Sequence, residues 1–219
     1  MLAQMVGELS ALHHFVRGGD MRDPSDRIGL GSLGAELVRD ESAGGYRVER
    51  SFEFDHDEPS GAPPLSRFGV DVKTGDVITA INGVPLLLVA DPAILLRKQA
   101  GQQVLLTVKS GDGALRDVIV TPVSMGEASN IRYNDWEVSR RRIVEAASDR
   151  TIGYVHLRAM GTANMAEFAK GFYPAFNRDG LIIDVRRNNG GNIDSWVLSR
   201  LLRKAWMFWN QREGRAPSW

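Results

Sequence analysis

A nearly all-apolar stretch over residues 180–186 runs into Asn188, Asn189, Gly190 and Gly191. The apolar stretch predicts a buried parallel strand, and the two glycines allow a tight turn before a helix begins. Open α/β sheets place their sites at this carboxyl edge, where free backbone amides can stabilise a developing negative charge. Two interpretations stay open: an oxyanion hole at the glycine pair, or a strand-to-helix turn that only needs residues without a Cβ atom. The phosphate-binding pattern G-x-x-x-x-G-K-[ST] is absent from the sequence.

The histidine pair His13 and His14 is the second candidate for chemistry. A neutral imidazole can take a proton from a hydroxyl nucleophile near pH 7, so a general base is one interpretation. A surface residue is the other, and a metal site is disfavoured because no third ligand lies at a useful spacing. His56 lies in an acidic loop, which predicts solvent exposure, and His156 lies inside an apparent strand, which predicts a core or sheet-face position.

The middle of the chain, residues 28–123, has the pattern of short strands. Residues 75–83, Gly-Asp-Val-Ile-Thr-Ala-Ile-Asn-Gly, predict a strand that is closed by an Asn-Gly turn. Asp91 followed by Pro92 predicts a helix start, and that helix is expected to run to Gly101. Short strands, a small helix and a longer helix around this run resemble a PDZ domain.

The PDZ resemblance implies a groove between one strand and the longer helix, here residues 93–100, which accepts a peptide as an added strand. The glycine-rich stretch over residues 28–34 precedes the first strand. Its amides could hold a terminal carboxylate, and the candidate peptide-binding residues are Leu30, Gly31, Leu33 and Gly34. A flexible loop before the strand is the alternative interpretation of the same stretch.

The segment after Met125 has a different pattern. The expected elements are a charged helix (133–147), a strand (152–157), a helix (165–176), the strand at 180–186 and a final helix (193–209). Strand, helix and apolar strand form a βαβ unit, so a parallel sheet covered by helices is expected. One such unit leaves both sheet edges open, which predicts that the chain contains only part of this domain.

Composition excludes several classes of function. The 219 residues include 27 Lys and Arg and 27 Asp and Glu, so the chain lacks the basic excess that nucleic-acid binding requires. The absence of cysteine excludes disulfides, thiolate zinc sites and a cysteine nucleophile. The longest apolar run, residues 84–90, is too short to span a membrane, and the N-terminus has no basic region typical of a secretory signal. We therefore expect a cytoplasmic protein that binds neither nucleic acid nor membrane.

The order of several motifs resembles the C-terminal half of tricorn proteases over nearly the whole chain. These motifs are Gly7-Glu8-Leu9 followed by His13, the PDZ-like module, Arg132-Tyr133-Asn134-Asp135-Trp136, Ile152-Gly153-Tyr154-Val155-His156-Leu157, and Leu181-Ile182-Ile183-Asp184-Val185-Arg186 with Gly190-Gly191. The resemblance implies a serine peptidase that acts on peptides and needs no cofactor, and it allows a homo-oligomer at full length. It also implies that His13 is the general base, that Gly190 with its neighbour Gly191 is the oxyanion site, and that His13 approaches this turn.

Two departures from the family pattern matter. Well-known members have a serine before the catalytic histidine, whereas this sequence has Leu12 there, so another group must orient His13. The nucleophilic serine and its supporting acid are implied to lie beyond residue 219, because the family places no nucleophile at Ser195 or Ser199. The β-propellers that precede the catalytic part in full-length members are also absent. The fragment by itself is therefore expected to be inactive.

These observations predict an α+β and α/β chain in which a PDZ-like small β-barrel module is inserted between pieces of an incomplete α/β serine-peptidase domain. The expected parts are an N-terminal catalytic piece (1–25), the PDZ-like domain (26–124), a linker helix (125–150) and the first, truncated βαβα part of the peptidase domain (151–219). One alternative is a peptide-binding adaptor without catalysis. Another is a tail-specific processing protease, which shares the Asp-x-Arg-x-Asn-x-Gly-Gly turn but resembles a serine–lysine system and needs no upstream histidine.

Overall fold

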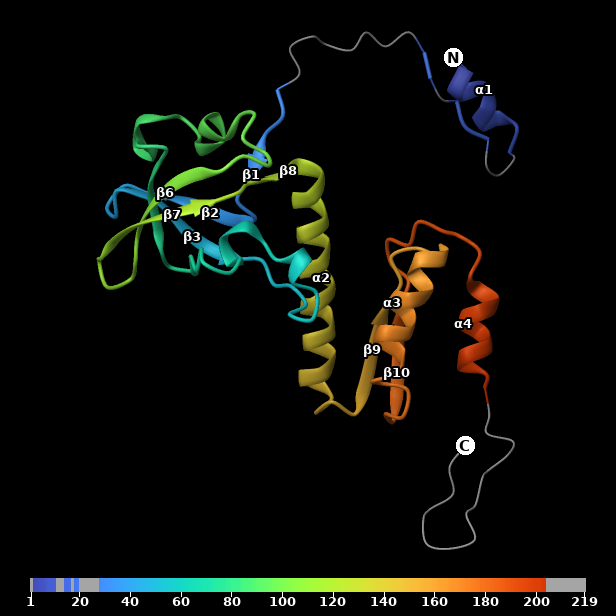
Figure 1. Ribbon diagram of the computed structural model, residues 1–219. Helices are drawn as coiled ribbons and strands as arrows, with labels where there is room; N and C mark the ends of the chain where they lie inside the picture. Colours follow the sequence, from blue (N-terminus) through green and yellow to red (C-terminus); the bar gives the residue numbers. More distant parts are fainter. Residues whose placement is uncertain (1, 11–13, 17, 20–27, 204–219) are drawn as a thin grey trace, which may run out of the picture.

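The long helix α2 (Met125–Ala147) lies between two folded parts of the molecule (Figure 1). The computed structural model describes residues 2–10, 14–16, 18–19 and 28–203. On one side of α2 lies an antiparallel sheet, and on the other lies a small α/β unit, while the short helix α1 (Leu2–Glu8) stands apart from both. Within the described residues, no helix is both long and apolar enough to cross a bilayer.

The larger sheet has six strands in the order β2-β3-β4-β6-β7, with β5 paired to β4, and neighbouring strands are antiparallel. The strands are β2 (Ala35–Asp40), β3 (Gly45–Ser51), β4 (Val77–Ile81), β5 (Val84–Pro85), β6 (Val104–Lys109) and β7 (Leu115–Val120). Their inward face forms the main core, in which Val48, Ile78 and Leu106 are fully buried. The sheet is open, with β2 and β7 at its edges, which is consistent with the expected PDZ-like module.

The helix expected over residues 92–101 is shorter than predicted. Asp91 caps it as expected, because its carboxylate accepts a backbone N–H of the first turn at 2.7 Å, but the element is a 3-10 helix, η4 (Pro92–Leu96). The chain then becomes extended, Lys98 adopts a φ of +58°, and the Lys98 N–H donates to the Gly29 carbonyl at 2.7 Å. This contact with a segment distant in sequence ends the helix early.

Two short strands bring the ends of this module together. β1 (Gly31–Ser32) pairs with β8 (Val123–Ser124), which leads directly into α2. The Ser124 hydroxyl accepts the Glu127 N–H, and the Glu127 carboxylate accepts the Ser124 N–H. This capping box starts α2 at Met125, where the linker helix was expected to begin and before the start of the charged helix expected over residues 133–147.

The α/β unit is built on two parallel strands, β9 (Ile152–His156) and β10 (Gly180–Asp184). Their first residues are paired with each other, and so are their last residues. Helix α3 (Thr162–Phe172) connects the strands, and α4 (Asp194–Leu201) follows β10. The predicted βαβ unit with a parallel sheet is therefore confirmed. The strand β10 was expected to be buried, but it is only partly so and Ile182 is exposed, because within the described residues β10 has a strand neighbour on one side only. The expected final helix was longer than α4, and its residues after 203 lie outside the described residues.

Helices α2 and α3 cover opposite faces of the parallel sheet. Successive side chains of a strand point to opposite faces, so the buried β9 needs cover on both. Val155 packs with Phe168 of α3 in one apolar cluster. The ring of His156 points the other way and contacts the ring of Trp136 on α2, at a centroid distance of 5.1 Å.

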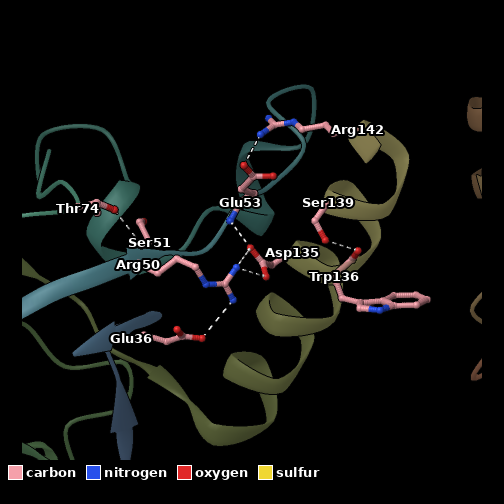
Figure 2. Close-up of polar contacts among 9 residues, drawn as sticks. All are labelled: Glu36, Arg50, Ser51, Glu53, Thr74, Asp135, Trp136, Ser139 and Arg142. Carbon is pink, nitrogen blue, oxygen red and sulfur yellow. Dashed lines mark hydrogen bonds and ion pairs between the residues drawn. The ribbon is translucent and has the colours of Figure 1, made fainter. Parts of the chain in front are cut away.

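A buried carboxylate on α2 holds this helix to the antiparallel sheet (Figure 2). Asp135 is 5% exposed, and it accepts hydrogen bonds from Arg50 Nη1 at 2.9 Å and from the Glu53 N–H at 2.8 Å. The same guanidinium pairs with Glu36 of β2 at 3.2 Å. Because the carboxylate is charged and receives both a guanidinium and a backbone donor, it fixes α2 against the end of β3.

Candidate functional site

The turn that follows β10 is bound to the segment that follows β9. The Met160 N–H donates to the Gly190 carbonyl at 2.8 Å, and the Asn192 N–H donates to the Met160 carbonyl at 2.9 Å. These two bonds form a parallel bridge between Met160 and Gly191 beyond the ends of the strands. The glycine pair therefore lies at the carboxyl edge of the sheet, where open α/β sheets hold their sites.

Both glycines are required by the backbone, but for different reasons. Gly190 has a φ of +81° and open space where a Cβ atom would be, so its requirement is conformational. Gly191 has a φ of +140°, and a Cβ atom there would lie 2.2 Å from the carbonyl carbon and oxygen of Met160. At Gly191 two backbones approach so closely that a side chain has no room.

Within the described residues, hydrogen bonds use every backbone N–H from Asn188 to Ile193 except one. The N–H of Asn188 donates to Val185, that of Asn189 to Arg158, and those of Asn192 and Ile193 to Met160. The Gly190 N–H donates to the side-chain Oδ1 of Asn188 at 2.7 Å. Only the Gly191 N–H has no partner in the described part of the chain. The Gly190 N–H, which the sequence suggested as the oxyanion donor, is thus already used in a hydrogen bond. The N–H of its neighbour Gly191 is available.

Asp184, the last residue of β10, has a buried carboxylate that accepts several hydrogen bonds. It accepts the Tyr154 hydroxyl at 2.7 Å, the Arg186 N–H at 2.9 Å and the Arg186 guanidinium at 2.9 Å. The guanidinium, together with the Tyr154 hydroxyl, holds the pKa of Asp184 well below its usual value. The pKa of Tyr154 is raised, mainly by burial and to a smaller extent by the hydrogen bond to Asp184. Asp184 is therefore an ionised structural group that holds the end of the strand from which the turn departs.

His156 joins α2 to the end of β10. It is 5% exposed; its Nδ1 lies 2.8 Å from the Asp184 carbonyl oxygen and its Nε2 lies 2.6 Å from the Tyr133 hydroxyl. Burial lowers the pKa of His156, which favours the neutral ring. The neutral ring donates from Nδ1 to the carbonyl and accepts the hydroxyl at Nε2, so both nitrogens are occupied. His156 is a buried structural residue, as its position in a strand predicted, and His56 is exposed, as its acidic loop predicted.

Two aromatic side chains of α2 contact guanidinium groups around the turn. Arg186 and Arg187 place their guanidinium carbons 5.3 and 5.1 Å from the Trp136 ring centroid. Arg158 lies 4.2 Å from the centroid of Tyr133. Arg187 has a φ of +59°, which is uncommon for a residue with a side chain. The sequence alone did not assign these arginines and aromatic residues to the site. It did single out the motif over residues 132–136, which contains Tyr133 and Trp136.

The predicted general base lies outside the described residues. His13 and the preceding Leu12 are not described, so the approach of His13 to the Gly190 turn stays a prediction. The neighbouring His14 is described and is exposed.

Helix α4 carries the two serines that follow the glycine pair in sequence. Ser195 and Ser199 are exposed, and the Ser199 hydroxyl donates to the Trp196 carbonyl at 2.8 Å. Neither hydroxyl is hydrogen-bonded to a histidine or lysine within the residues that the structure describes. The same residues contain no group of three His, Cys, Asp or Glu side chains that could hold a metal ion.

The four candidate peptide-binding residues lie near β1 and the start of β2, and they are Leu30, Gly31, Leu33 and Gly34. Leu33 belongs to the core, and Leu30 forms a bridge with the segment after η4. A Cβ atom at Gly34 would lie 2.6 Å from Pro64, so close packing accounts for this glycine. Binding of a peptide carboxylate at these residues stays a prediction.

A polar cavity of about 460 Å³ lies between the loop before η1 (Pro59–Gly61), α2, β9 and α3. The Nζ atom of Lys170 on α3 lies 3.0 Å from Glu58 Oε1 and 3.6 Å from Asp55 Oδ2. The Nη1 atom of Arg141 on α2 lies 3.8 Å from Asp55 Oδ2. Burial raises the pKa of Glu137, which also lines the cavity. Several of the lining charges pair across the cavity, which makes it a charged junction between the two parts of the molecule.

Comparisons with known proteins match the chain in two segments, one on each side of α2. Residues 31–125 match the tricorn protease PDZ domain family, and residues 151–218 match peptidase family S41. The first match covers the antiparallel sheet with β1 and β8, and the second covers β9, β10 and the glycine turn.

Similar proteins match the chain along its whole length. Tricorn protease homolog 1 of Streptomyces coelicolor is 34% identical over 100% of this chain and 20% of its own length. Tricorn protease of Thermoplasma acidophilum is 28% identical over 98% of this chain and 19% of its own length. A crystal structure of the tricorn protease has a TM-score of 0.74 at 27% identity, over 86% of this chain and 18% of that chain. The chain spans about a fifth of the length of these curated relatives, and it belongs to the tricorn protease family.

Proposed function

We propose that this chain is a fragment of a serine peptidase of tricorn type, which degrades peptides by acyl transfer. The observation that carries this proposal is the Gly191 N–H, which is free within the described residues and lies in the segment that matches peptidase family S41. A backbone amide held by a rigid turn suits a developing oxyanion, because it needs no rearrangement when the charge forms.

In the proposed reaction, a serine hydroxyl that lies outside this chain attacks the peptide carbonyl. His13 takes the hydroxyl proton as general base and then gives it to the leaving amine as general acid. The charge that forms on the carbonyl oxygen is stabilised by the Gly191 N–H, while Gly190 provides the turn geometry. Water then attacks the acyl-enzyme carbonyl while His13 takes its proton, and His13 gives that proton to the departing serine oxygen, which releases the acid product; the reaction needs no cofactor.

The PDZ-like module is proposed to bind a peptide, either substrate or partner. β2 is an edge strand, and within the described residues its outer side has no strand neighbour. An extended peptide can add to such an edge through main-chain hydrogen bonds. A homo-oligomer at full length and a cytoplasmic location complete the proposal.

The test is an assay of the full-length protein with fluorogenic peptides and a fluorophosphonate probe. We expect peptide hydrolysis and covalent labelling of a serine outside residues 1–219. A full-length protein that takes up no probe and cleaves none of the peptides contradicts the proposal.

A peptide-binding adaptor without catalysis is the second candidate, and the free edge of β2 is the observation that favours it. The same full-length protein separates the two functions. An adaptor would bind labelled peptides in a fluorescence polarisation titration and leave them intact, whereas the peptidase would bind and cleave them.

A further inference from the structure

The side chain of Asn188 makes two hydrogen bonds that cross the glycine turn. Its Nδ2 donates to the Leu157 carbonyl at 2.7 Å, and its Oδ1 accepts the Gly190 N–H at 2.7 Å. Leu157 is fully buried, and its own N–H donates to the Asp184 carbonyl at 2.9 Å. Asn188 therefore connects the buried ends of β9 and β10 with the glycine pair.

Hydrogen bonds hold both peptide planes that flank Gly190. Asn188 holds the plane before it, and the Met160 N–H holds the plane after it by donating to the Gly190 carbonyl at 2.8 Å. In a trans peptide the N–H points opposite to the C=O, so the second bond directs the Gly191 N–H away from Met160.

Packing does not hold Gly190 in place. Apart from Gly190 itself and its two chain neighbours, no described residue has an atom within 4 Å of the position that a Cβ atom would take. Glycine rotates about φ and ψ with little steric penalty, so removal of either hydrogen bond would free one of the two planes. The orientation of the glycine pair therefore depends on these few hydrogen bonds.

We propose that Asn188 is a positioning residue of the oxyanion site, an inference that rests on the proposed peptidase function. Its side chain occupies the Gly190 N–H and holds the turn, so that the Gly191 N–H is presented in a fixed direction to the oxyanion. Asparagine suits this role because one short planar amide offers both a donor and an acceptor. The next residue, Asn189, is exposed, and its side chain makes no hydrogen bond within the described residues.

The first test compares these two asparagines in the full-length enzyme. Asn188→Ala is expected to lower kcat about tenfold to a hundredfold, somewhat less than outright loss of an oxyanion donor. KM should change little, because the affected interaction forms mainly in the transition state. The matched control Asn189→Ala should keep kcat within about twofold. Equal losses in the two variants overturn the proposal, and so does an Asn188→Ala effect that is confined to KM.

The second test uses Asn188→Asp and varies the pH. An ionised carboxylate can accept the Gly190 N–H, but it cannot donate to the Leu157 carbonyl, and it adds negative charge beside the oxyanion. A protonated carboxyl has one donor and one acceptor, which restores both hydrogen bonds. The ratio of kcat for this variant to kcat for the wild type should therefore rise as the pH falls towards the carboxyl pKa, ordinarily about 3.9. A pH-independent ratio overturns the proposal, and this test still decides if Asn188→Ala does not fold.

The third test measures amide hydrogen exchange by NMR in the 219-residue chain, where no activity is needed. The Gly190 N–H should exchange about fivefold faster in Asn188→Ala than in the wild type, as expected on losing one neutral hydrogen bond. It should be unchanged in Asn189→Ala, and the Gly191 N–H should be unprotected in all three proteins.

These tests separate the failure of the inference from the failure of the proposed function. Unchanged exchange at Gly190 in Asn188→Ala overturns the hydrogen-bond arrangement itself. Faster exchange with an unchanged kcat overturns the positioning role. Faster exchange in a protein whose full-length form cleaves no peptide overturns the proposed peptidase and leaves the structural role of Asn188 in place.

Discussion

Single residues at the turn after β10 divide into those that offer a backbone donor and those that hold the backbone. Within the described residues, Gly191 offers the N–H that lacks a partner, and Asn188 occupies the N–H of Gly190. Asp184 and His156 hold the ends of the two strands through buried hydrogen bonds. The side chains around the turn thus serve geometry, while the proposed chemistry uses a backbone amide.

One prediction at this scale concerns the proposed general base. His13→Ala in the full-length enzyme should lower kcat by several orders of magnitude, because an unactivated serine hydroxyl is a weak nucleophile. The matched variant His14→Ala should cost far less, since this side chain is exposed. Steady-state kinetics of both variants decide the matter. An inactive His14→Ala beside a normal His13→Ala would shift the assignment by one residue.

A second prediction compares the two glycines in the 219-residue chain. Gly190→Ala should lower the free energy of unfolding by about 1–2 kcal/mol, because only the backbone conformation is strained. Gly191→Ala should cost about 3 kcal/mol or more, because its Cβ atom also meets the backbone of Met160. Urea denaturation measures both values. A larger loss for Gly190→Ala would contradict the close approach at Gly191.

Helix α2 is the element that contacts both folded parts. Asp135 binds β3 and the residues that follow it, and the next residue, Trp136, contacts His156 and the arginines of the glycine turn. Adjacent residues of a helix point in different directions, so one turn of α2 serves both sides. The sequence motif Arg-Tyr-Asn-Asp-Trp therefore has a structural explanation that does not involve contact with substrate.

The contact with the antiparallel sheet is tested by Asp135→Ala. This change leaves the Glu53 N–H and part of the Arg50 guanidinium without their acceptor, so the free energy of unfolding should fall by about 2–3 kcal/mol. Glu36→Ala removes the exposed partner of the same guanidinium and should cost less than about 1 kcal/mol. Guanidinium chloride denaturation distinguishes the variants, and equal costs would show that Asp135 does not hold α2.

The contact between α2 and β9 predicts a dependence of stability on pH. The pKa of His156 is lowered by burial from an ordinary value of 6.5. Below 6.5 the unfolded chain therefore binds a proton that the folded chain does not, and stability should fall as the pH drops from that value towards the lowered pKa. At higher pH this contribution is fully restored.

The measurement is Tm of the wild type and of His156→Gln from about pH 7.5 to about pH 5. The glutamine variant should be less stable at neutral pH and should lose less stability on acidification. Other titrating groups are common to both proteins and cancel in the comparison. Parallel curves would show that His156 titrates alike in the folded and unfolded chains.

At the scale of the whole molecule, residues 28–203 form two folded parts that meet along α2 and at the charged cavity. The α/β unit exposes several large apolar side chains, namely Ile182, Val185, Trp196, Leu198 and Leu202. Within the described residues, the outer edge of β10 has no strand neighbour either. These features agree with the proposal that this unit is part of a larger peptidase domain.

At this scale we predict that the 219-residue chain alone hydrolyses no peptide and takes up no fluorophosphonate label. Its exposed serines Ser195 and Ser199 lack a hydrogen-bonded base within the described residues, and an unactivated hydroxyl reacts slowly. The full-length protein under the same conditions is the positive control. Covalent labelling of the isolated chain would place the nucleophile inside it.

The sequence by itself determined the features that depend on a few adjacent residues. The apolar stretches predicted the parallel βαβ unit, because strands of a parallel sheet are typically continuous apolar runs joined by a helix. The Asn-Gly pair predicted a tight turn, and Asn82 and Gly83 do adopt φ values of +49° and +77°. The glycine pair after β10 could be located in the same way, since only glycine tolerates such a backbone without strain.

Only the tertiary structure decided which amide is available, where η4 ends and what holds α2. Asn188 bonds a carbonyl 31 residues away, and Arg50 bonds Asp135 across 85 residues. Lys98 donates to Gly29 and thereby ends a helix that local propensity would continue. The physical reason is the same in each case: a hydrogen-bond partner from a distant segment is chosen by how the elements pack, and residue spacing does not encode that choice.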